Sequence, residues 1–422
     1  MKKIFSHKLY LTLLVSDLIS NFGDTLYYLA LMTYVAALKN SNLAISIINI
    51  SETLPILFTI LFGFLADRTI NKVDSIVKTL WIRVLLYLFV AVAMTFKQSL
   101  LIVVFASFVN LISDTLGQFE NGLFYPISNR IVKPSDREEM MAFRQTVTSA
   151  MGIVYQSVAV ILIAVFSYFN LALINSFTFL CSLVIFMLVK KKINEVYSVE
   201  EKPVTTEKLA LKTLFSAISS DLKQSLKQLF SVSSMKSVLF VIPFLNAGLA
   251  IITPLVVMTL SKTSSFTIIN PATTISLLGI SAISGGLLGG FLVLTNKMFK
   301  TATINTLLKM NLLAVLLLFL AFYFQNIYLV ILFHFFSNLF VSSLNPKMGA
   351  IIFNHIEETK LATLFGGMVT YFQMGEIISK LFFSGLVIYL SSRDISVIYG
   401  IMIILTISYL WRSDKLARRT VE

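Results

Sequence analysis

Twelve long apolar runs follow one another along this chain of 422 residues, and this succession restricts the possible folds more than any other feature. The runs lie at about 9–37, 42–66, 75–95, 99–129, 138–167, 169–190, 236–261, 267–294, 302–324, 326–350, 359–390 and 394–411. A helix that crosses a bilayer needs roughly 17–25 predominantly apolar residues, and each run meets that length. Because lipid cannot satisfy backbone hydrogen bonds, such runs must form helices. The sequence therefore predicts an all-α membrane protein with twelve transmembrane helices.

Composition excludes the main soluble alternatives. Hydrophobic residues make up 57% of the chain and charged residues 13%, whereas globular domains carry about 25% charged residues. This leaves too little polar surface for a cytosolic enzyme, a disordered protein or a secreted disulfide scaffold. The single cysteine, Cys181, can form no intramolecular disulfide.

Lysine and arginine sort to one side of the predicted membrane. If the N-terminus is cytoplasmic, the inner loops hold most of the basic residues behind the net charge of +13. The outer loops hold only Lys39, Lys97, Lys262 and Arg393. This asymmetry predicts a bacterial inner or plasma membrane protein with both termini cytoplasmic. The excess charge is then a sorting signal and a contact with anionic lipid, and no nucleic acid is expected to bind.

One connector is longer and more polar than the others. Residues 193–235 include an apolar stripe close to a 3.6-residue period, formed by Leu211, Leu214, Phe215, Ile218, Leu222, Leu226 and Leu229. Charged residues occupy the opposite face, so the stripe predicts an amphipathic helix on the cytoplasmic membrane surface. A docking site for a soluble partner is the alternative.

The connector divides the chain into two halves of six spans. We predict an N-terminal six-helix bundle at 1–192, a cytoplasmic amphipathic linker at 193–235, and a C-terminal six-helix bundle at 236–422. This is the usual layout of a secondary transporter, which holds its substrate between the halves near the midplane. No GxxxxGK[ST] motif is present, so the chain has no recognisable ATP site.

The most specific motif follows the second predicted span and reads Gly63-Phe-Leu-Ala-Asp67-Arg68-Thr-Ile-Asn-Lys72. It resembles the signature G-x-x-x-D-R-x-G-x-R/K-R/K between helices two and three of the major facilitator superfamily. Gly63, Asp67, Arg68 and Lys72 match the signature, while Ile70 replaces its second glycine. The resemblance implies the major facilitator fold and a cytoplasmic gating role for this loop. The alternative is a solvated loop whose charges only set the topology.

The residues of this motif also have a direct physical interpretation. Gly63 permits close packing of two helices. Asp67 can accept hydrogen bonds from the N-terminus of a neighbouring helix or pair with a cation such as Arg130. The corresponding loop after the eighth predicted span, which runs from Gly289 to Lys297, has no acidic residue, so we expect the two gates to differ.

Two further segments narrow the resemblance. Asn21-Phe-Gly23-Asp24, and the stretch from Tyr125-Pro126 to Asp136, look like bacterial drug-efflux members of the macrolide type. This resemblance implies multidrug resistance through proton antiport. Two departures weaken the antiporter inference: Asp114 stands near the position where such antiporters carry arginine, and Gly152 lacks the proline that usually follows.

Acidic residues within the apolar runs are the main candidates for function, because a charge at the centre of a helix costs at least ~2.5 kcal/mol. Asp24 and Glu52 lie at comparable depths, and two carboxyls close together in a low-dielectric site suit proton exchange. Asp114 is expected to face the cavity as well. We therefore predict Asp24, Glu52 and Asp114 as proton or substrate groups; the alternative is that they hydrogen-bond neighbours such as Ser51 or Tyr27.

Other charges within the spans are expected to pair with each other. The residues at similar depths on the cytoplasmic side, which predict a buried ion-pair network, are Asp17, Arg83, Glu120 and Arg144. Glu376 and Lys380 are four residues apart on one predicted helix and form a secondary candidate pair. His334 lacks a second ligand at metal-binding spacing, so it is expected to be structural. Neither a metal nor a cofactor is predicted.

These features together predict a secondary active transporter that exports an amphipathic, drug-like small molecule by alternating access, coupled to protons. We expect a monomer in the membrane. Two alternatives remain open: an importer of a nutrient, peptide or lipid-like solute, and a non-transporting membrane scaffold or immunity protein. An enzyme is not expected, because no nucleophile–base–acid cluster is present.

Overall fold

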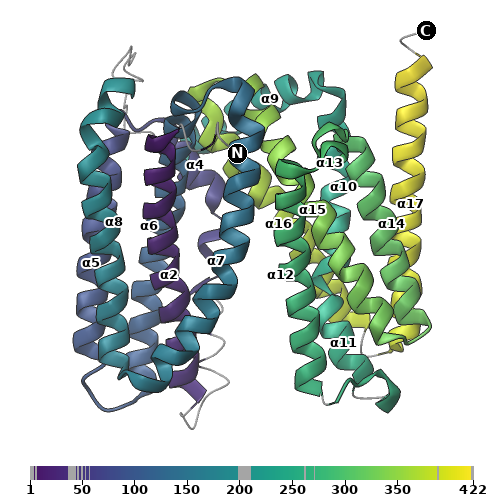
Figure 1. Cartoon of the computed structure of the whole chain (residues 1–422), viewed down its shortest axis with the longest axis horizontal. Helices are drawn as coiled ribbons and strands as arrows, with labels where there is room; N and C mark the ends of the chain where they lie inside the picture. The colour runs from purple at the N-terminus through teal and green to yellow at the C-terminus, as the bar shows by residue number, and fades with distance from the viewer. Residues whose placement is uncertain are drawn as a thin grey trace. The chain divides into compact units, whose positions relative to one another are not determined.

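The computed structural model describes residues 7–36, 58–197, 211–260, 263–269, 271–386 and 389–419, together with 4, 44, 47–48, 51–52 and 54–56. Regular structure within these ranges is helical, and no strand occurs there (Figure 1). Lys39 and Lys262, two of the basic residues expected in the outer loops, lie outside the described residues. The side chains of residues 211–215 are also outside the description.

Each predicted span contains at least one helix, so the all-α fold class is confirmed. The first six spans contain α2 (Lys8–Ala36), α4 (Thr59–Asp67), α5 (Lys72–Ala93), α6 (Leu100–Ile131), α7 (Arg137–Val165) and α8 (Tyr168–Tyr197). The last six contain α10 (Ser233–Ala250), α11 (Ile252–Leu260), α12 (Pro271–Thr295), α14 (Ile304–Tyr323), α15 (Ile327–His355), α16 (Leu361–Leu386) and α17 (Ser392–Arg419). The shorter α13 (Lys297–Thr301) follows α12.

Nine helical segments of the described chain are long and apolar enough to cross a membrane. They support a multi-pass membrane protein. The long helices α2 and α16 are not among these nine. Asp17, Asn21 and Asp24 lie within α2, so polar residues interrupt its apolar sequence. One of these two helices therefore carries predicted site residues.

The chain folds into two compact units. The first unit comprises Met1–Asp136, Met151–Leu226 and Ile356–Thr370, and the second comprises Arg137–Ala150, Lys227–His355 and Tyr371–Glu422. Three helices change unit along their length: α7 after Ala150, α9 (Leu211–Ser231) after Leu226 and α16 after Thr370. The units thus differ from a simple division of the sequence, and the predicted domain boundaries stay a prediction.

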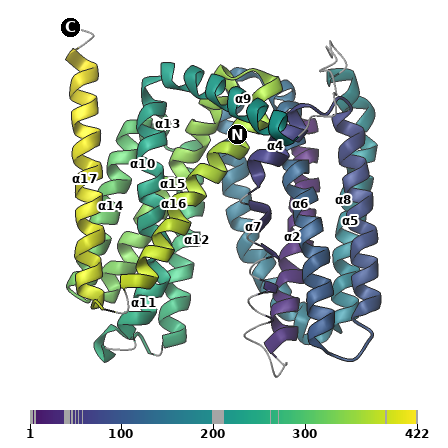
Figure 2. The ribbon, with the colours of Figure 1, turned by 180° about the vertical axis from the view of Figure 1, so that it is seen from behind.

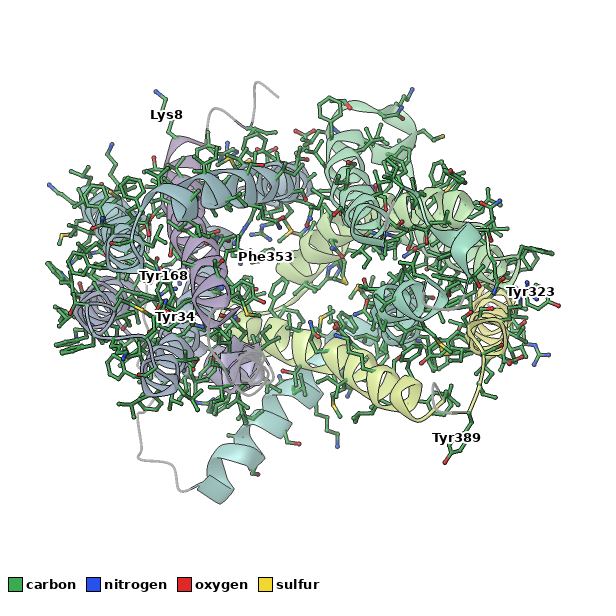
Figure 3. All side chains as sticks on the ribbon, turned by 90° about the horizontal axis from the view of Figure 1, so that it is seen from below. Lys8, Tyr34, Tyr168, Tyr323, Phe353 and Tyr389 are labelled. Atoms are coloured by element: carbon green, nitrogen blue, oxygen red, sulfur yellow. The ribbon has the colours of Figure 1, made fainter. Side chains whose placement is uncertain are left out.

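Within the first unit, α8 packs along both α2 and α5 (Figures 1 and 2). Tyr34 of α2 and Tyr168 of α8 meet edge to face with ring centroids 5.0 Å apart (Figure 3). Nearer the middle of α2, a Cβ added to Gly23 would lie only 2.0 Å from Thr178 Oγ1 on α8. Glycine therefore permits the close approach of α2 to α8 beside Asp24.

Within the second unit, α15 packs along α12 and α14, and α14 packs along α17 (Figures 1 and 2). Small residues again allow the closest helix contact. A Cβ on Gly289 of α12 would lie 2.1 Å from the carbonyl oxygen of Leu339 on α15. Larger side chains at this position would separate the two backbones.

The linker contains the expected helix, α9 (Leu211–Ser231). Its apolar face is not wholly free for lipid, because Ile218 and Leu229 are buried in the protein. Leu222 packs beside Gly367 of α16, and Gln224 accepts a hydrogen bond from Lys360 at 2.8 Å. The part of α9 that belongs to the first unit therefore packs against the start of α16.

Candidate functional site

The first unit contains a polar cavity of about 220 Å³ between α2, α5, α6 and the segment around residue 55. Its walls are formed by Asp17, Ser20, Asn21, Asp24, Glu52, Pro55, Ile56, Arg83, Asp114, Gly117, Gln118, Glu120, Asn121 and Phe124. Five carboxyl groups and one guanidinium line it, so acidic groups are in excess. All three predicted proton or substrate residues are among them.

Arg83 is the basic group of the cavity and is almost completely buried. Its guanidinium donates to Asp24 Oδ2 at 2.8 Å and to Ser113 Oγ at 3.0 Å, and Glu120 Oε2 lies 3.8 Å away. The ring of Phe179 covers one face of the guanidinium, 4.0 Å from ring centroid to Cζ. The planar donors and the aromatic contact fix the position of this charge.

A second group of residues is organised by an amide. The Asn110 side chain donates from Nδ2 to Glu52 Oε1 at 2.7 Å and to Asp114 Oδ2 at 2.9 Å. The hydroxyl of Tyr87 donates to Asn110 Oδ1 at 2.8 Å. Within the described part of the chain, no lysine, arginine or histidine lies within ion-pair distance of Glu52 or Asp114.

These pairings group the predicted residues in a different way from the sequence analysis. Asp24 and Glu52 line one cavity as expected, but Asp24 contacts Arg83, while Glu52 is bridged to Asp114. Asp17 accepts a hydrogen bond from Asn21 at 3.0 Å. Arg144 belongs to the second unit, so the four-residue network stays a prediction.

Sequence reasoning missed Asn110, Ser113 and Tyr87. Asn110 precedes Asp114 by four residues, so the two side chains lie one turn apart on α6. That spacing within an apolar run is the available signal for Asn110. Nothing comparable in the sequence indicates Tyr87, because a tyrosine among apolar residues is usual in a membrane helix.

The cavity offers acceptors for positive charge. Asp24 Oδ1 is a buried oxygen atom without a hydrogen-bond partner in the described structure. The second oxygens of Glu52 and Asp114 take no hydrogen bond from the described protein atoms. No three His, Cys, Asp or Glu side chains of the described residues are placed to hold one metal ion. The arrangement suits a proton or an organic cation.

The motif around Asp67 forms a second site in the first unit. Asp67 Oδ1 accepts from the backbone N–H of Ala362 at 3.0 Å, and Oδ2 accepts from the N–H and hydroxyl of Thr363 at 2.7 and 2.6 Å. These donors belong to the first turn of α16, where carboxylates are favourable. A Cβ on Gly63 would lie 2.1 Å from the carbonyl oxygen of Ala362, so glycine permits this approach.

The basic residues of the motif stabilise the end of α4. Lys72 is buried, and its Nζ donates to the carbonyl oxygens of Ala66 at 2.8 Å and Asp67 at 3.0 Å. The Arg68 guanidinium lies 3.6 Å from the centroid of the Phe64 ring. Arg130 forms an ion pair with Glu358 at 2.6 Å.

The second unit has a corresponding polar contact with a different origin. The loop between α12 and α13 supplies no acid, but Lys347 of α15 pairs with Glu138 of α7 at 2.7 Å. Lys300 of α13 forms an ion pair with Glu139. The carbonyl oxygen of Phe353, labelled in Figure 3, accepts from Arg137 at 2.7 Å. Here the start of α7 contributes the acidic residues.

The remaining candidates in the second unit have local partners. Glu376 and Lys380 form an ion pair of 2.5 Å on α16, and Ser281 Oγ lies 3.0 Å from His334 Nδ1.

A separate cavity of about 490 Å³ lies between α10, α16 and α17 and has almost wholly apolar walls. It is lined by Pro243, Phe244, Ala247, Tyr371, Met374, Gly375, Ile378, Ser379, Phe382, Ile398, Tyr399 and Met402.

No protein-family model and no curated protein matches the sequence. Among solved structures, the chain is similar to a bacterial homologue of the iron transporter ferroportin in the outward-facing state, with a TM-score of 0.67 and 12% identity over 96% of this chain and 98% of that chain. It is also similar to the proton:xylose symporter XylE, with a TM-score of 0.63 and 14% identity over 97% and 95% of the two chains.

A third similar structure is FucP in the outward conformation, with a TM-score of 0.58 and 15% identity over 94% of this chain and 98% of that chain. XylE and FucP are major facilitator superfamily transporters. At these identities the likeness establishes the fold. The chain therefore has the fold of the major facilitator transporters, as the motif around Asp67 predicted.

Proposed function

We propose that this protein is a secondary active transporter that exports an amphipathic small molecule by alternating access, in exchange for protons. The observation that carries the proposal is the acidic cavity in the first unit, where five carboxyl groups face one guanidinium. Charged groups within membrane helices are expensive, and they commonly belong to ion or substrate pathways. The similarity to transporters of solved structure supports a transport role.

The groups of the cavity have separate roles in this proposal. Glu52 and Asp114 have no basic partner within ion-pair distance in the described structure, so they are available to a cation or a proton. Asp24 is held by Arg83 and can change partner when a cation enters. Contact of Asp67 with the first turn of α16 would act as the cytoplasmic gate.

The cellular setting completes the proposal. We place the protein in the bacterial inner or plasma membrane as a monomer, with both termini cytoplasmic. Drug-like compounds with a positive charge and an apolar body are the proposed substrates, which would make the protein a multidrug resistance factor.

Transport in reconstituted liposomes tests this function. The purified protein, placed in vesicles with an imposed pH gradient, is expected to move lipophilic cations against their concentration gradient. Asp24→Asn should abolish the gradient-driven flux, whereas Asp394→Asn, which changes an exposed acid outside the cavity, should retain it. Flux that persists without a pH gradient would overturn proton coupling. Absence of flux for every cation would overturn the export function.

Import is the second candidate, because XylE is a symporter of a sugar with protons. The same vesicles distinguish the two directions. An importer would accumulate a sugar, peptide or lipid-like solute together with protons, and would leave the lipophilic cations unmoved. A membrane scaffold would move neither class of solute and would tolerate Asp24→Asn and Glu52→Gln without loss of its role.

A further inference from the structure

We infer that Asn110 is the positioning residue of the acidic cavity, and that it holds Glu52 and Asp114 as a carboxylate pair that binds a single organic cationic group. This inference rests on the proposed function and names the substrate class of the same site. It starts from the hydrogen bonds that Asn110 makes and from the space beside them.

The orientation of the amide is fixed on both sides. Asn110 is 5% exposed, and its Oδ1 accepts from Tyr87, so Nδ2 must face the two carboxyl groups. Each of its two N–H groups then donates to a different carboxylate. The ordinary geometry of an amide NH₂ group places those two oxygens about 5 Å apart. Two negative charges from different parts of the chain are thereby kept at a fixed separation.

The pair remains available for a ligand. The second oxygen of Glu52 and of Asp114 takes no donor from the described residues, although both side chains line the cavity. The other charged groups of the cavity are Asp17, Asp24, Glu120 and Arg83. Arg83 lies within ion-pair distance of Asp24 and Glu120. The carboxylate pair therefore carries the charge that the protein compensates least.

The size of the cavity limits what can bind there. A volume of about 220 Å³ is below the roughly 300 Å³ at which sites for whole drug-sized ligands begin. It accommodates a cationic head group beside Phe124, with the rest of the molecule outside. Independent support comes from Asp24 Oδ1, a buried oxygen without a partner in the described structure. An entering cation would supply the missing positive partner.

Binding of the cation competes with protons. When a permanently charged ligand occupies the pair, a proton on Glu52 or Asp114 is released to solvent, so one positive charge replaces another. The amide donors of Asn110 stabilise the charged form of both carboxyls. Removing those donors should therefore weaken the cation site and shift the pH at which it becomes half occupied.

Binding to the purified full-length protein tests the inference without any need for transport. The probe is benzyltrimethylammonium, whose charge does not change with pH, and benzyl alcohol is the neutral comparison. Isothermal calorimetry from pH 5 to 9 should give saturable binding of the cation alone. Asn110→Leu should lower its affinity about tenfold and move the half-binding pH upward by about one unit.

Asn338→Leu is the matched control. It makes the same change at a half-buried asparagine of α15 that lines neither cavity and donates to the carbonyl oxygen of His334 at 2.8 Å. It should alter the affinity less than twofold and leave the half-binding pH in place. Equal effects of the two substitutions would overturn the inference, because loss of any half-buried or buried amide would then suffice.

A second variant covers the case in which Asn110→Leu fails to fold. Tyr87→Phe keeps the ring and removes only the hydroxyl that fixes the amide, so it should shift binding in the same direction by about threefold. Asn110→Gln, which keeps both donors, should restore part of the affinity. An unchanged affinity in Tyr87→Phe would contradict the inference, as would binding of benzyl alcohol equal to that of the cation.

The inference and the proposed function fail in different ways. Cation binding that depends on Asn110 without any flux in vesicles would support the site and overturn transport. Proton-coupled flux that does not respond to Asn110→Leu, with no binding of the cation, would leave transport in place and overturn the inferred site.

Discussion

The two cavities of this protein contrast in chemistry. The cavity of the first unit is small and lined by charged and amide side chains, whereas the cavity of the second unit is larger and almost wholly apolar. Of the three hydroxyl-bearing side chains that line the apolar cavity, two contact each other, because Ser379 Oγ and Tyr399 OH lie 2.9 Å apart. Hydroxyl groups that are already hydrogen-bonded need no partner from a ligand. The comparison teaches that, of these two cavities, the one in the first unit holds the charged side chains and the one in the second unit offers an apolar surface.

The largest effect should follow from removing the positive charge of the acidic cavity. Arg83→Met strands Asp24 and Glu120 in a buried site, so we expect the free energy of unfolding to fall by about 3–5 kcal/mol. Thermal unfolding in detergent measures the loss. Lys380→Met removes an exposed charge from the second unit and should change the stability by less than about 1 kcal/mol. Similar losses in the two variants would remove the contrast between the units.

An intermediate effect is expected at the contact between α4 and α16. Asp67→Ala leaves two backbone N–H groups and the hydroxyl of Thr363 without their acceptor, at a cost of about 1–3 kcal/mol. Hydrogen exchange of the amides at 362 and 363 should accelerate in this variant. Asp74→Ala breaks only an exposed ion pair with Lys190 and should leave that exchange rate unchanged. If the amides at 362 and 363 exchanged as slowly in Asp67→Ala as in the unchanged protein, their hydrogen bonds to Asp67 would not be what protects them from exchange.

A smaller effect is expected from removing one hydroxyl group at each cavity, and the two variants should differ in cation affinity rather than in stability. Ser113→Ala removes the hydroxyl that accepts from Arg83, and Ser379→Ala removes the one beside Tyr399. Each should cost about 1 kcal/mol of stability. Only Ser113→Ala should change the affinity for benzyltrimethylammonium, by calorimetry, because only that serine contacts a charged group of the acidic cavity. An equal change in Ser379→Ala would show that the cavities share one ligand.

The smallest effect is expected from filling the apolar cavity. Ala247→Phe adds a ring that this volume accommodates, so stability should change by less than about 1 kcal/mol and cation affinity should stay constant. Ala164→Phe, on an exposed position of α7, is the matched control for the larger side chain. A loss of cation binding in Ala247→Phe alone would assign a substrate role to the second unit.

Hydropathy and charge position predicted much of the fold and the general place of the acidic groups. Every predicted span contains a helix. Depth suggested that Asp24 and Glu52 lie near each other, and the expected fold suggested that Asp114 faces the cavity; all three line one cavity, while their roles stay a prediction. Depth in the membrane was sufficient for Asp24 and Glu52, because residues at equal depth on neighbouring helices have few other places to meet. The motif around Asp67 predicted a helix N-terminus as one of its possible partners.

Pairing within the cavity could not be predicted. Depth alone does not say which of several acids meets Arg83, because the answer depends on the rotation of each helix about its axis. That rotation is set by contacts such as Gly23 against Thr178, which hydropathy does not encode. The same reason explains why Asn110 was missed: an amide gains its importance from the carboxylate of another helix. The division of α7, α9 and α16 between the two units also cannot be predicted from hydropathy along the sequence.

The polar residues within α2 have a consequence for how the protein is made. Asp17, Asn21 and Asp24 lie on this one helix, and each reduces the tendency of the nascent segment to leave the translocon for lipid. The guanidinium that neutralises Asp24 arrives only when α5 has been synthesised. We therefore expect α2 to integrate stably only after α5 has entered the membrane. The ion pair between Arg83 and Asp24 would then also set the order in which these helices assemble.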